Sequence, residues 1–219
     1  MRFSGAIFDL DGTLLDSMPM WRGLGERYLN ACGVCPPKDI NERISKMSLA
    51  EAAEYFREEY GIEKSAEEIA EEVNASVRSE YENNLKLKSG AAEFLERLRR
   101  QNVVMCVATA TDGILARAAL ERTGVAMFFK GIISCKDVGE GKTKPKIYEA
   151  AREILGTPKE KTIVFEDAYH AAQTAVNAGF ALAAVYDKSE PEQSGLRGIA
   201  DYYIEDFGGA EAESIVRTR

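Results

Sequence analysis

Several short apolar segments of this sequence end in side chains that could do chemistry. These side chains are Asp9, Asp11, Thr109, Glu166 and Asp167. A lysine-rich turn at residues 141–145 follows a further apolar segment. Carboxyl groups gathered in one place repel one another, so such a site needs a cation, and Mg²⁺ prefers oxygen ligands of this kind. A magnesium ion, a lysine and a threonine hydroxyl together could neutralise the charge on a phosphoryl group.

Two of the carboxyl groups could take separate parts in such a reaction. One carboxylate can attack as a nucleophile and form an aspartyl-phosphate. A second carboxyl group nearby can protonate the leaving oxygen and later deprotonate a water molecule. Because a pair such as Asp11-Gly12 is commonly no more than a turn, the hypothesis depends on these groups coming together in the fold.

The apolar segments themselves predict the strands of a parallel sheet. The expected strands cover residues 6–8, 103–108, 131–134, 162–165, 181–186 and 201–204. Helical patterns lie between them, at residues 91–98, 114–122, 147–155 and 168–178. This alternation predicts an α/β fold with a doubly wound parallel sheet that is covered on both faces. Ligands of such sheets bind beyond the carboxyl ends of the strands, so we expect the polar side chains to meet in one crevice.

Residues 17–87 break the alternation. Helical patterns cover residues 21–31, 49–60 and 66–83, and no convincing strand lies among them. We therefore expect a core domain formed by residues 1–16 and 88–219, with an inserted all-helical domain at 17–87. A long insertion in a connection costs little loop entropy.

The composition is that of an ordinary globular protein. The 219 residues are 45% hydrophobic and 29% charged, with a net charge of -8. The acidic balance argues against a nucleic-acid partner, and no apolar run approaches the roughly 20 residues of a membrane span. The N-terminal segment carries three aspartates within residues 9–16, unlike a signal peptide. We expect a cytoplasmic protein that acts on a small molecule and has no membrane partner, and the sequence does not indicate an oligomeric state.

Four motifs resemble those of the haloacid dehalogenase superfamily, and the resemblance covers essentially the whole chain. Residues 8–17, Phe-Asp-Leu-Asp-Gly-Thr-Leu-Leu-Asp-Ser, resemble the first motif, and residues 107–110 resemble the second. Residues 141–148 resemble the third motif, and residues 164–167 resemble the fourth. The resemblance implies a Rossmann-like core and identifies the helical insert with the family's cap domain.

The resemblance also implies the roles of the acidic residues. Asp9 would be the nucleophile and a ligand of Mg²⁺. Asp11 would be the general acid and base, with its backbone carbonyl on the metal. Asp167 would bind Mg²⁺, and Glu166 would lie in its coordination sphere or just outside. An Asp at position 11 goes with phosphatases and phosphomutases of this family, whereas its absence goes with dehalogenases or phosphonatases.

The remaining motif residues would hold the phosphoryl group. Thr109 and the backbone N–H of Ala110 would bind it, and Lys142 would steady both Asp9 and the phosphate. The third motif departs from its usual form, Lys-Pro-x-Pro-Asp, because Thr143 and Lys146 stand where the first proline and the aspartate are expected. Lys144 also precedes a proline, so it is a rival to Lys142.

The substrate expected from this resemblance is a small organic phosphate monoester, such as a sugar phosphate. In the cap, Trp21 and Lys46 could contact it, although Trp21 could instead pack in the core of the insert. The leading prediction is a Mg²⁺-dependent phosphatase. A β-phosphoglucomutase-like phosphomutase, which uses the same core, is the first alternative. A non-catalytic phospho-acceptor module is a remote alternative, because its acceptor Asp would follow a middle strand of a shorter chain.

Overall fold

The computed structural model describes residues 3–44, 47 and 49–217, which form two compact units. The larger unit consists of Met1–Ser17 with Leu85–Arg219, and the smaller unit consists of Met18–Asn84. The four cysteines are free thiols. Among the described residues, no helix is both long and apolar enough to cross a membrane.

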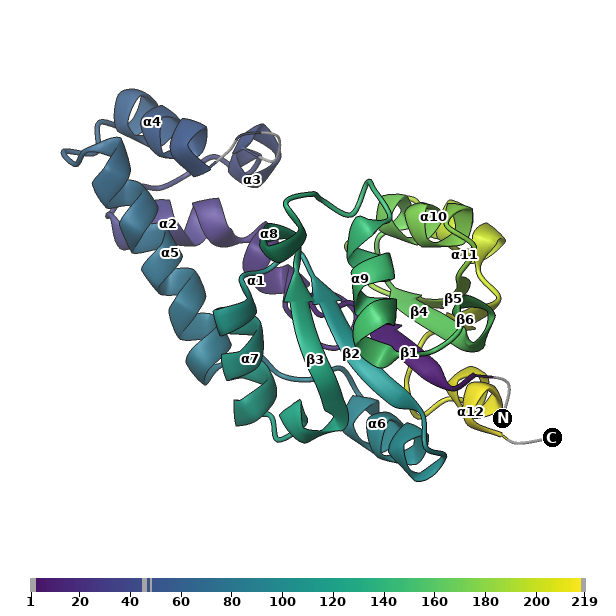
Figure 1. Ribbon diagram of the computed structural model, residues 1–219. Helices are drawn as coiled ribbons and strands as arrows, with labels where there is room; N and C mark the ends of the chain where they lie inside the picture. The colour runs from purple at the N-terminus through teal and green to yellow at the C-terminus, as the bar shows by residue number, and fades with distance from the viewer. Residues whose placement is uncertain (1–2, 45–46, 48, 218–219) are drawn as a thin grey trace. The chain divides into compact units, whose positions relative to one another are not determined.

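A six-stranded parallel sheet forms the centre of the larger unit (Figure 1). Across the sheet the strands follow the order β3 (Phe129–Ser134), β2 (Val104–Thr109), β1 (Gly5–Phe8), β4 (Thr162–Glu166), β5 (Ala181–Val185) and β6 (Tyr202–Ile204). All six predicted strands are confirmed, although β3 begins at Phe129 rather than Gly131. From β1 the chain builds the sheet outward through β2 and β3, and then returns to β4 on the other side of β1. The order therefore reverses at β1, and crevices for ligands form at such reversals.

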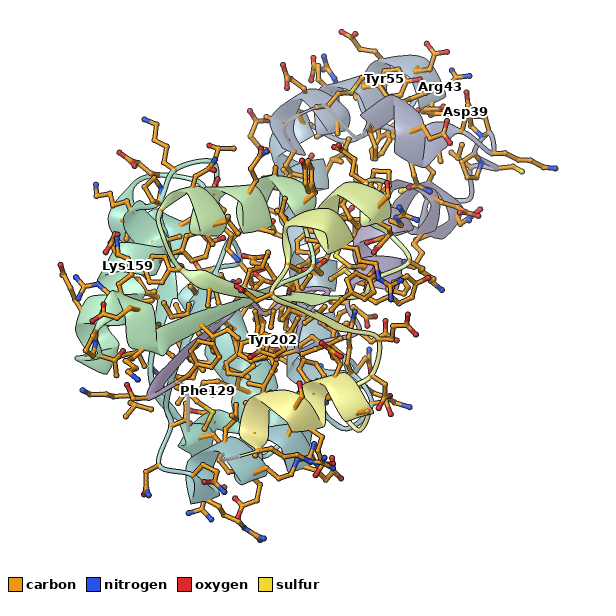
Figure 2. The ribbon with its side chains drawn as sticks, turned by 90° about the vertical axis from the view of Figure 1, so that its right-hand side faces the viewer. Asp39, Arg43, Tyr55, Phe129, Lys159 and Tyr202 are labelled. Atoms are coloured by element: carbon orange, nitrogen blue, oxygen red, sulfur yellow. The ribbon has the colours of Figure 1, made fainter. Side chains whose placement is uncertain are left out.

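Helices cover both faces of this sheet, as predicted for a doubly wound fold (Figure 2). One face carries α9 (Lys146–Leu155), α10 (Tyr169–Asn177) and α11 (Gln193–Ile199), and the other carries α6 (Ala91–Arg100), α7 (Gly113–Arg122) and α12 (Ala210–Val216). Because neighbouring strand residues point to opposite faces, Ile7 packs under α9 while Phe8 contacts Phe94 of α6, with ring centroids 6.4 Å apart. The central strands are thus buried on both sides, which explains why they are continuously apolar.

Short elements of the larger unit were not predicted. They are α8 (Cys135–Val138), α11, α12 and the 3₁₀ turns η1 (Ala126–Phe128) and η2 (Lys159–Lys161). In α11, Gly195 and Gly198 weaken the helical pattern, because glycine is a poor helix former. The α8 turn has only four residues, but Ser134 and Asp137 form a capping box that fixes its start.

The described part of the smaller unit contains helices and no strand. The helices are α1 (Met18–Arg22), α2 (Leu24–Ala31), α3 (Ile40–Ile44), α4 (Leu49–Tyr60) and α5 (Ala66–Asn83). The predicted limits of α4 and α5 are confirmed. The single helix predicted at residues 21–31 is wrong, because the chain breaks at Gly23 into two helices, and α3 was not predicted.

Candidate active site

Three of the sequence-predicted site residues of the larger unit lie where its central strands end. Asp9 directly follows β1, Thr109 ends β2, and Glu166 ends β4. The strand register places Phe8 beside both Val107 and Phe165, so β1, β2 and β4 end at nearly the same level. The backbone N–H of Asp9 donates to the carbonyl oxygen of Phe165 at 2.9 Å, which extends the pairing of β1 with β4 past the end of β1.

Three carboxyl groups gather at this edge of the sheet. Asp9, Glu166 and Asp167 each offer an oxygen atom, and these atoms lie within 4.8 Å of one another. All three side chains are buried, with residue exposures of 7%, 1% and 4%. The Thr13 hydroxyl donates to Oδ1 of Asp167 at 2.9 Å and so fixes that carboxylate.

A single lysine joins two of these carboxylates. The Lys142 ammonium group donates to Oδ1 of Asp9 and to Oε1 of Glu166, and its side chain is buried. The Tyr148 hydroxyl also donates to Oε1 of Glu166, at 2.8 Å. Lys144, by contrast, is exposed. Of the two rival lysines, the structure brings Lys142 to the acidic cluster and leaves Lys144 at the surface.

Burial dominates the electrostatics of this cluster. It raises the pKa of Asp9 from its ordinary 3.8 to about 6; the ammonium of Lys142 opposes this shift, and the charge of Glu166 adds to it. Burial also raises the pKa of Asp167 well above 3.8, and the charges of Asp9 and Glu166 reinforce the effect. Burial disfavours the charged form of Lys142, but the carboxylates of Asp9 and Glu166 outweigh it and raise the pKa of this lysine. When all three carboxyl groups are ionised, the cluster carries more negative charge than one lysine can balance.

The arrangement fits a hard divalent cation such as Mg²⁺. Oδ2 of Asp9 is buried and has no hydrogen-bond partner among the described residues, although a buried polar atom is normally paired. Asp9 and Asp167 supply the carboxylate oxygens that Mg²⁺ prefers. Oε1 of Glu166 already accepts from Lys142 and Tyr148. Asp9 and Asp167 therefore suit direct ligation best, with Glu166 supporting Lys142.

Magnesium should stabilise the folded protein through this cluster. Binding at about 100 times the dissociation constant contributes about 2.7 kcal/mol, or a rise of about 5–10 °C in Tm for a chain of this size. Since the folded-state pKa values of Asp9 and Asp167 are raised, their contribution to metal-free stability is present at acid pH and is lost as pH rises through about 6 for Asp9. The Mg²⁺ effect should therefore be larger at pH 7 than at pH 5, as thermal unfolding with Mg²⁺ or EDTA can show.

Asp167→Asn is the matched variant for this experiment. It removes one of the repelling charges, so the metal-free protein should be at least as stable as the wild type at pH 7. The rise in Tm on adding Mg²⁺ should shrink to near zero. An undiminished rise would place the ion elsewhere.

The two lysines can be separated by matched substitutions. Lys142→Gln leaves Asp9 and Glu166 without their shared cation, and truncation of one partner in a buried ion pair is strongly destabilising. We expect turnover of a phosphate ester to fall by about 100-fold or more in Lys142→Gln. Lys144→Gln changes an exposed side chain and should stay within about twofold of the wild type. Equal losses in the two variants would contradict the placement of Lys142.

The backbone beyond β2 presents hydroxyl groups to the same edge of the sheet. Thr109 is fully buried, and Ala110 follows it at the surface. The Thr111 hydroxyl donates to Oδ2 of Asp11 at 2.6 Å. Asp11 is not one of the three clustered carboxylates, so its environment differs from that of Asp9.

Two residues of the insert, Trp21 and Lys46, were predicted to contact the substrate. Trp21 is 37% exposed, and its indole N–H donates to the Tyr81 hydroxyl at 3.2 Å within that unit. Lys46 lies outside the described residues. In the same unit Arg43 pairs with Asp39 at 2.9 Å, and both are labelled in Figure 2.

Sequence reasoning missed the supporting roles of Thr13, Thr111 and Tyr148. Thr13 and Tyr148 stand inside the first and third motifs, so their position was a signal. Their bonds to Asp167 and Glu166 join segments far apart in the chain, which no local pattern reveals.

Known proteins resemble this chain in sequence and in fold. Residues 6–185 match the family of haloacid dehalogenase-like hydrolases. A phosphorylated carbohydrates phosphatase of Thermotoga maritima is 28% identical over 173 residues, covering 79% of this chain and 80% of that protein. The validoxylamine A 7'-phosphate phosphatase of Streptomyces hygroscopicus subsp. limoneus is 30% identical over 179 residues, covering 80% of this chain and 81% of that protein.

A solved structure is similar over a still larger part of the chain. It is a Thermotoga maritima protein provisionally named a β-phosphoglucomutase, with a TM-score of 0.82 and 26% identity, covering 92% of this chain and 94% of that one. The family match spans all four motifs and the strands that end in the acidic cluster. The chain therefore belongs to the haloacid dehalogenase-like hydrolases, and it is an enzyme of the phosphatase and phosphomutase kind.

Proposed function

We propose that this enzyme is a Mg²⁺-dependent phosphatase that hydrolyses a small organic phosphate monoester, such as a sugar phosphate, through an aspartyl-phosphate on Asp9. The observation that carries this proposal is the contrast between two aspartates two residues apart. Asp9 is buried and bonded to Lys142, whereas Asp11 stands outside the acidic cluster and accepts from Thr111. These different surroundings suit Asp9 for attack on phosphorus and Asp11 for proton transfer.

Asp9 would begin the reaction. A carboxylate oxygen of Asp9 attacks phosphorus, an O–P bond forms, and the bond from phosphorus to the ester oxygen breaks. Lys142 holds Oδ1 of Asp9 in place, and its positive charge favours the phosphoryl oxygens nearby. Asp9 and Asp167 would hold Mg²⁺, which would supply further charge neutralisation for the phosphoryl group.

Asp11 would handle the protons of both half-reactions. In the first, its carboxyl group gives a proton to the departing ester oxygen, so the product leaves as an alcohol. In the second, the resulting carboxylate takes a proton from water, whose oxygen attacks phosphorus. The bond between Asp9 and phosphorus then breaks, phosphate departs, and both carboxyl groups return to their starting states.

The smaller unit would act as a cap that selects the substrate. This proposal keeps residues 17–87 as the cap domain and assigns contacts with the organic group to its side chains, Trp21 and Lys46 among them. Lids of this kind exclude water and complete a site when they close. The relatives include a phosphatase of phosphorylated carbohydrates, which supports the proposal of a substrate of modest size.

A phosphomutase is the second candidate. The similarity to the Thermotoga maritima protein provisionally named a β-phosphoglucomutase favours it. Such an enzyme would return the phosphoryl group from Asp9 to a hydroxyl of the bound sugar rather than to water. A non-catalytic phospho-acceptor module has no comparable support, because the chain belongs to an enzyme family.

A panel of phosphate esters separates the two candidates. The protein is incubated with Mg²⁺ and each ester, and both released phosphate and rearranged sugar phosphate are measured. We expect phosphate release from at least one sugar phosphate, with no isomer formed. Isomerised product without released phosphate would overturn the phosphatase proposal in favour of the mutase.

A further inference from the structure

Thr111 forms hydrogen bonds with both the carboxyl group of Asp11 and the hydroxyl group of Thr109. Its side-chain hydroxyl donates to Oδ2 of Asp11 at 2.6 Å, across a sequence separation of 100 residues. Its backbone N–H donates to Oγ1 of Thr109 at 3.0 Å. One residue thus contacts the side chain of the predicted general acid and base and that of the predicted phosphoryl-binding threonine.

The local structure holds Thr111 firmly. The chain leaves β2 at Thr109, and Asp112 caps α7 two residues after Ala110 by accepting from the N–H of Ile114 at 2.9 Å. The turn from Thr109 to Thr111 is closed by the bond to the Thr109 hydroxyl, a turn that threonine commonly forms. Thr111 is therefore fixed between the end of a buried strand and the start of a capped helix.

The backbone bond orients Thr109. Its hydroxyl oxygen accepts from the N–H of Thr111, so a lone pair of that oxygen is occupied and the hydroxyl proton is left to donate. A phosphoryl oxygen is an acceptor, so this is the arrangement that a phosphoryl-binding hydroxyl requires.

The side-chain bond orients Asp11. Its length lies in the range of a hydroxyl bonded to a carboxylate, about 2.5–2.7 Å. A hydroxyl that donates to Oδ2 favours the proton on Oδ1 and restricts rotation of the carboxyl group. We propose that Thr111 is a positioning residue, which holds Asp11 in the orientation for proton transfer to the ester oxygen. This inference rests on the proposed role of Asp11 as general acid and base.

The test compares two esters that share a ring. Phenyl phosphate and p-nitrophenyl phosphate differ chiefly in the basicity of the leaving oxygen, and only the more basic phenoxide needs a proton as it departs. In Thr111→Val, kcat/KM for phenyl phosphate should fall by about 10- to 100-fold, a part of the roughly 10²–10⁴-fold that general acid catalysis contributes. The loss for p-nitrophenyl phosphate should be several times smaller. The ratio of the two values does not depend on the fraction of folded protein, so a partly unfolded sample still reports on the mechanism.

Matched variants complete the experiment. Thr111→Ser keeps the donor and should restore the ratio to near the wild-type value, whereas Thr111→Ala, a second variant without the donor, should repeat the change. Thr123→Val removes a hydroxyl that donates to Ala119 O at the far end of α7, and the ratio should stay at the wild-type value. Equal losses on both esters, or no loss in Thr111→Val, would overturn the positioning role. A wild-type protein that turns over neither these esters nor the sugar phosphates of the panel would instead overturn the proposed function itself.

Discussion

Asp9→Asn should abolish the turnover of every phosphate ester while the protein stays folded. An amide oxygen is a poor nucleophile, so no aspartyl-phosphate can form, and we expect at least a thousand-fold loss in kcat, as for other enzymes that lose a nucleophile. The substitution removes no volume. Since burial raises the pKa of Asp9 to about 6 in the metal-free protein, a neutral group at this position should not lower the free energy of unfolding there.

The measurement combines p-nitrophenol release in the presence of Mg²⁺ with thermal unfolding in EDTA. Asp39→Asn is a matched control, because Asp39 is an exposed aspartate of the smaller unit that pairs with Arg43. It should keep near wild-type turnover. Activity of Asp9→Asn within tenfold of the wild type would remove Asp9 as the nucleophile.

Asp11→Asn should also cause a large loss of turnover, and the loss should differ between the two half-reactions. General acid–base catalysis contributes about 10²–10⁴-fold, so steady-state turnover should fall by that amount. With p-nitrophenyl phosphate the first half-reaction needs no acid, whereas the second still needs a base to deprotonate water. The variant should therefore release about one equivalent of p-nitrophenol rapidly and then turn over slowly.

Stopped-flow absorbance can detect that burst. The burst amplitude should match the concentration of folded enzyme, and it should vanish in the double variant Asp9→Asn with Asp11→Asn. A slow linear release without a burst would mean that the first half-reaction of this ester also needs Asp11. Wild-type kinetics in Asp11→Asn would remove it from the mechanism.

The core of the fold could be predicted from the sequence because its central strands are buried on both faces. Such strands are continuous apolar runs, and polar residues such as Asp9 and Thr109 mark their carboxyl ends. The helices α4 and α5 were likewise predicted with their limits, and in the structure a capping box of Ser65 and Glu68 fixes the start of α5. Elements without these signals were missed, such as α11, whose glycines obscure its pattern.

The candidate site could be predicted in part for a similar reason. Strand ends and motif order brought Asp9, Asp167 and Lys142 together in the prediction. The contacts of Thr13 with Asp167 and of Tyr148 with Glu166 span 154 and 18 residues, and only the packed structure decides them.

In the smaller unit, the helix break at Gly23 was also missed, because a helical pattern runs through it and one glycine alone does not decide where a helix ends.

The proposed mechanism requires Asp9 to carry the phosphoryl group during catalysis. The most direct measurement is rapid acid quenching of the Asp11→Asn protein with p-nitrophenyl phosphate and Mg²⁺, followed by mass spectrometry of its peptides. We expect a peptide containing Asp9 that is heavier by one phosphoryl group, in about the amount of the burst, and no such peptide in the double variant. A phosphoryl group on another residue, or free phosphate formed in a burst without any labelled peptide, would contradict it.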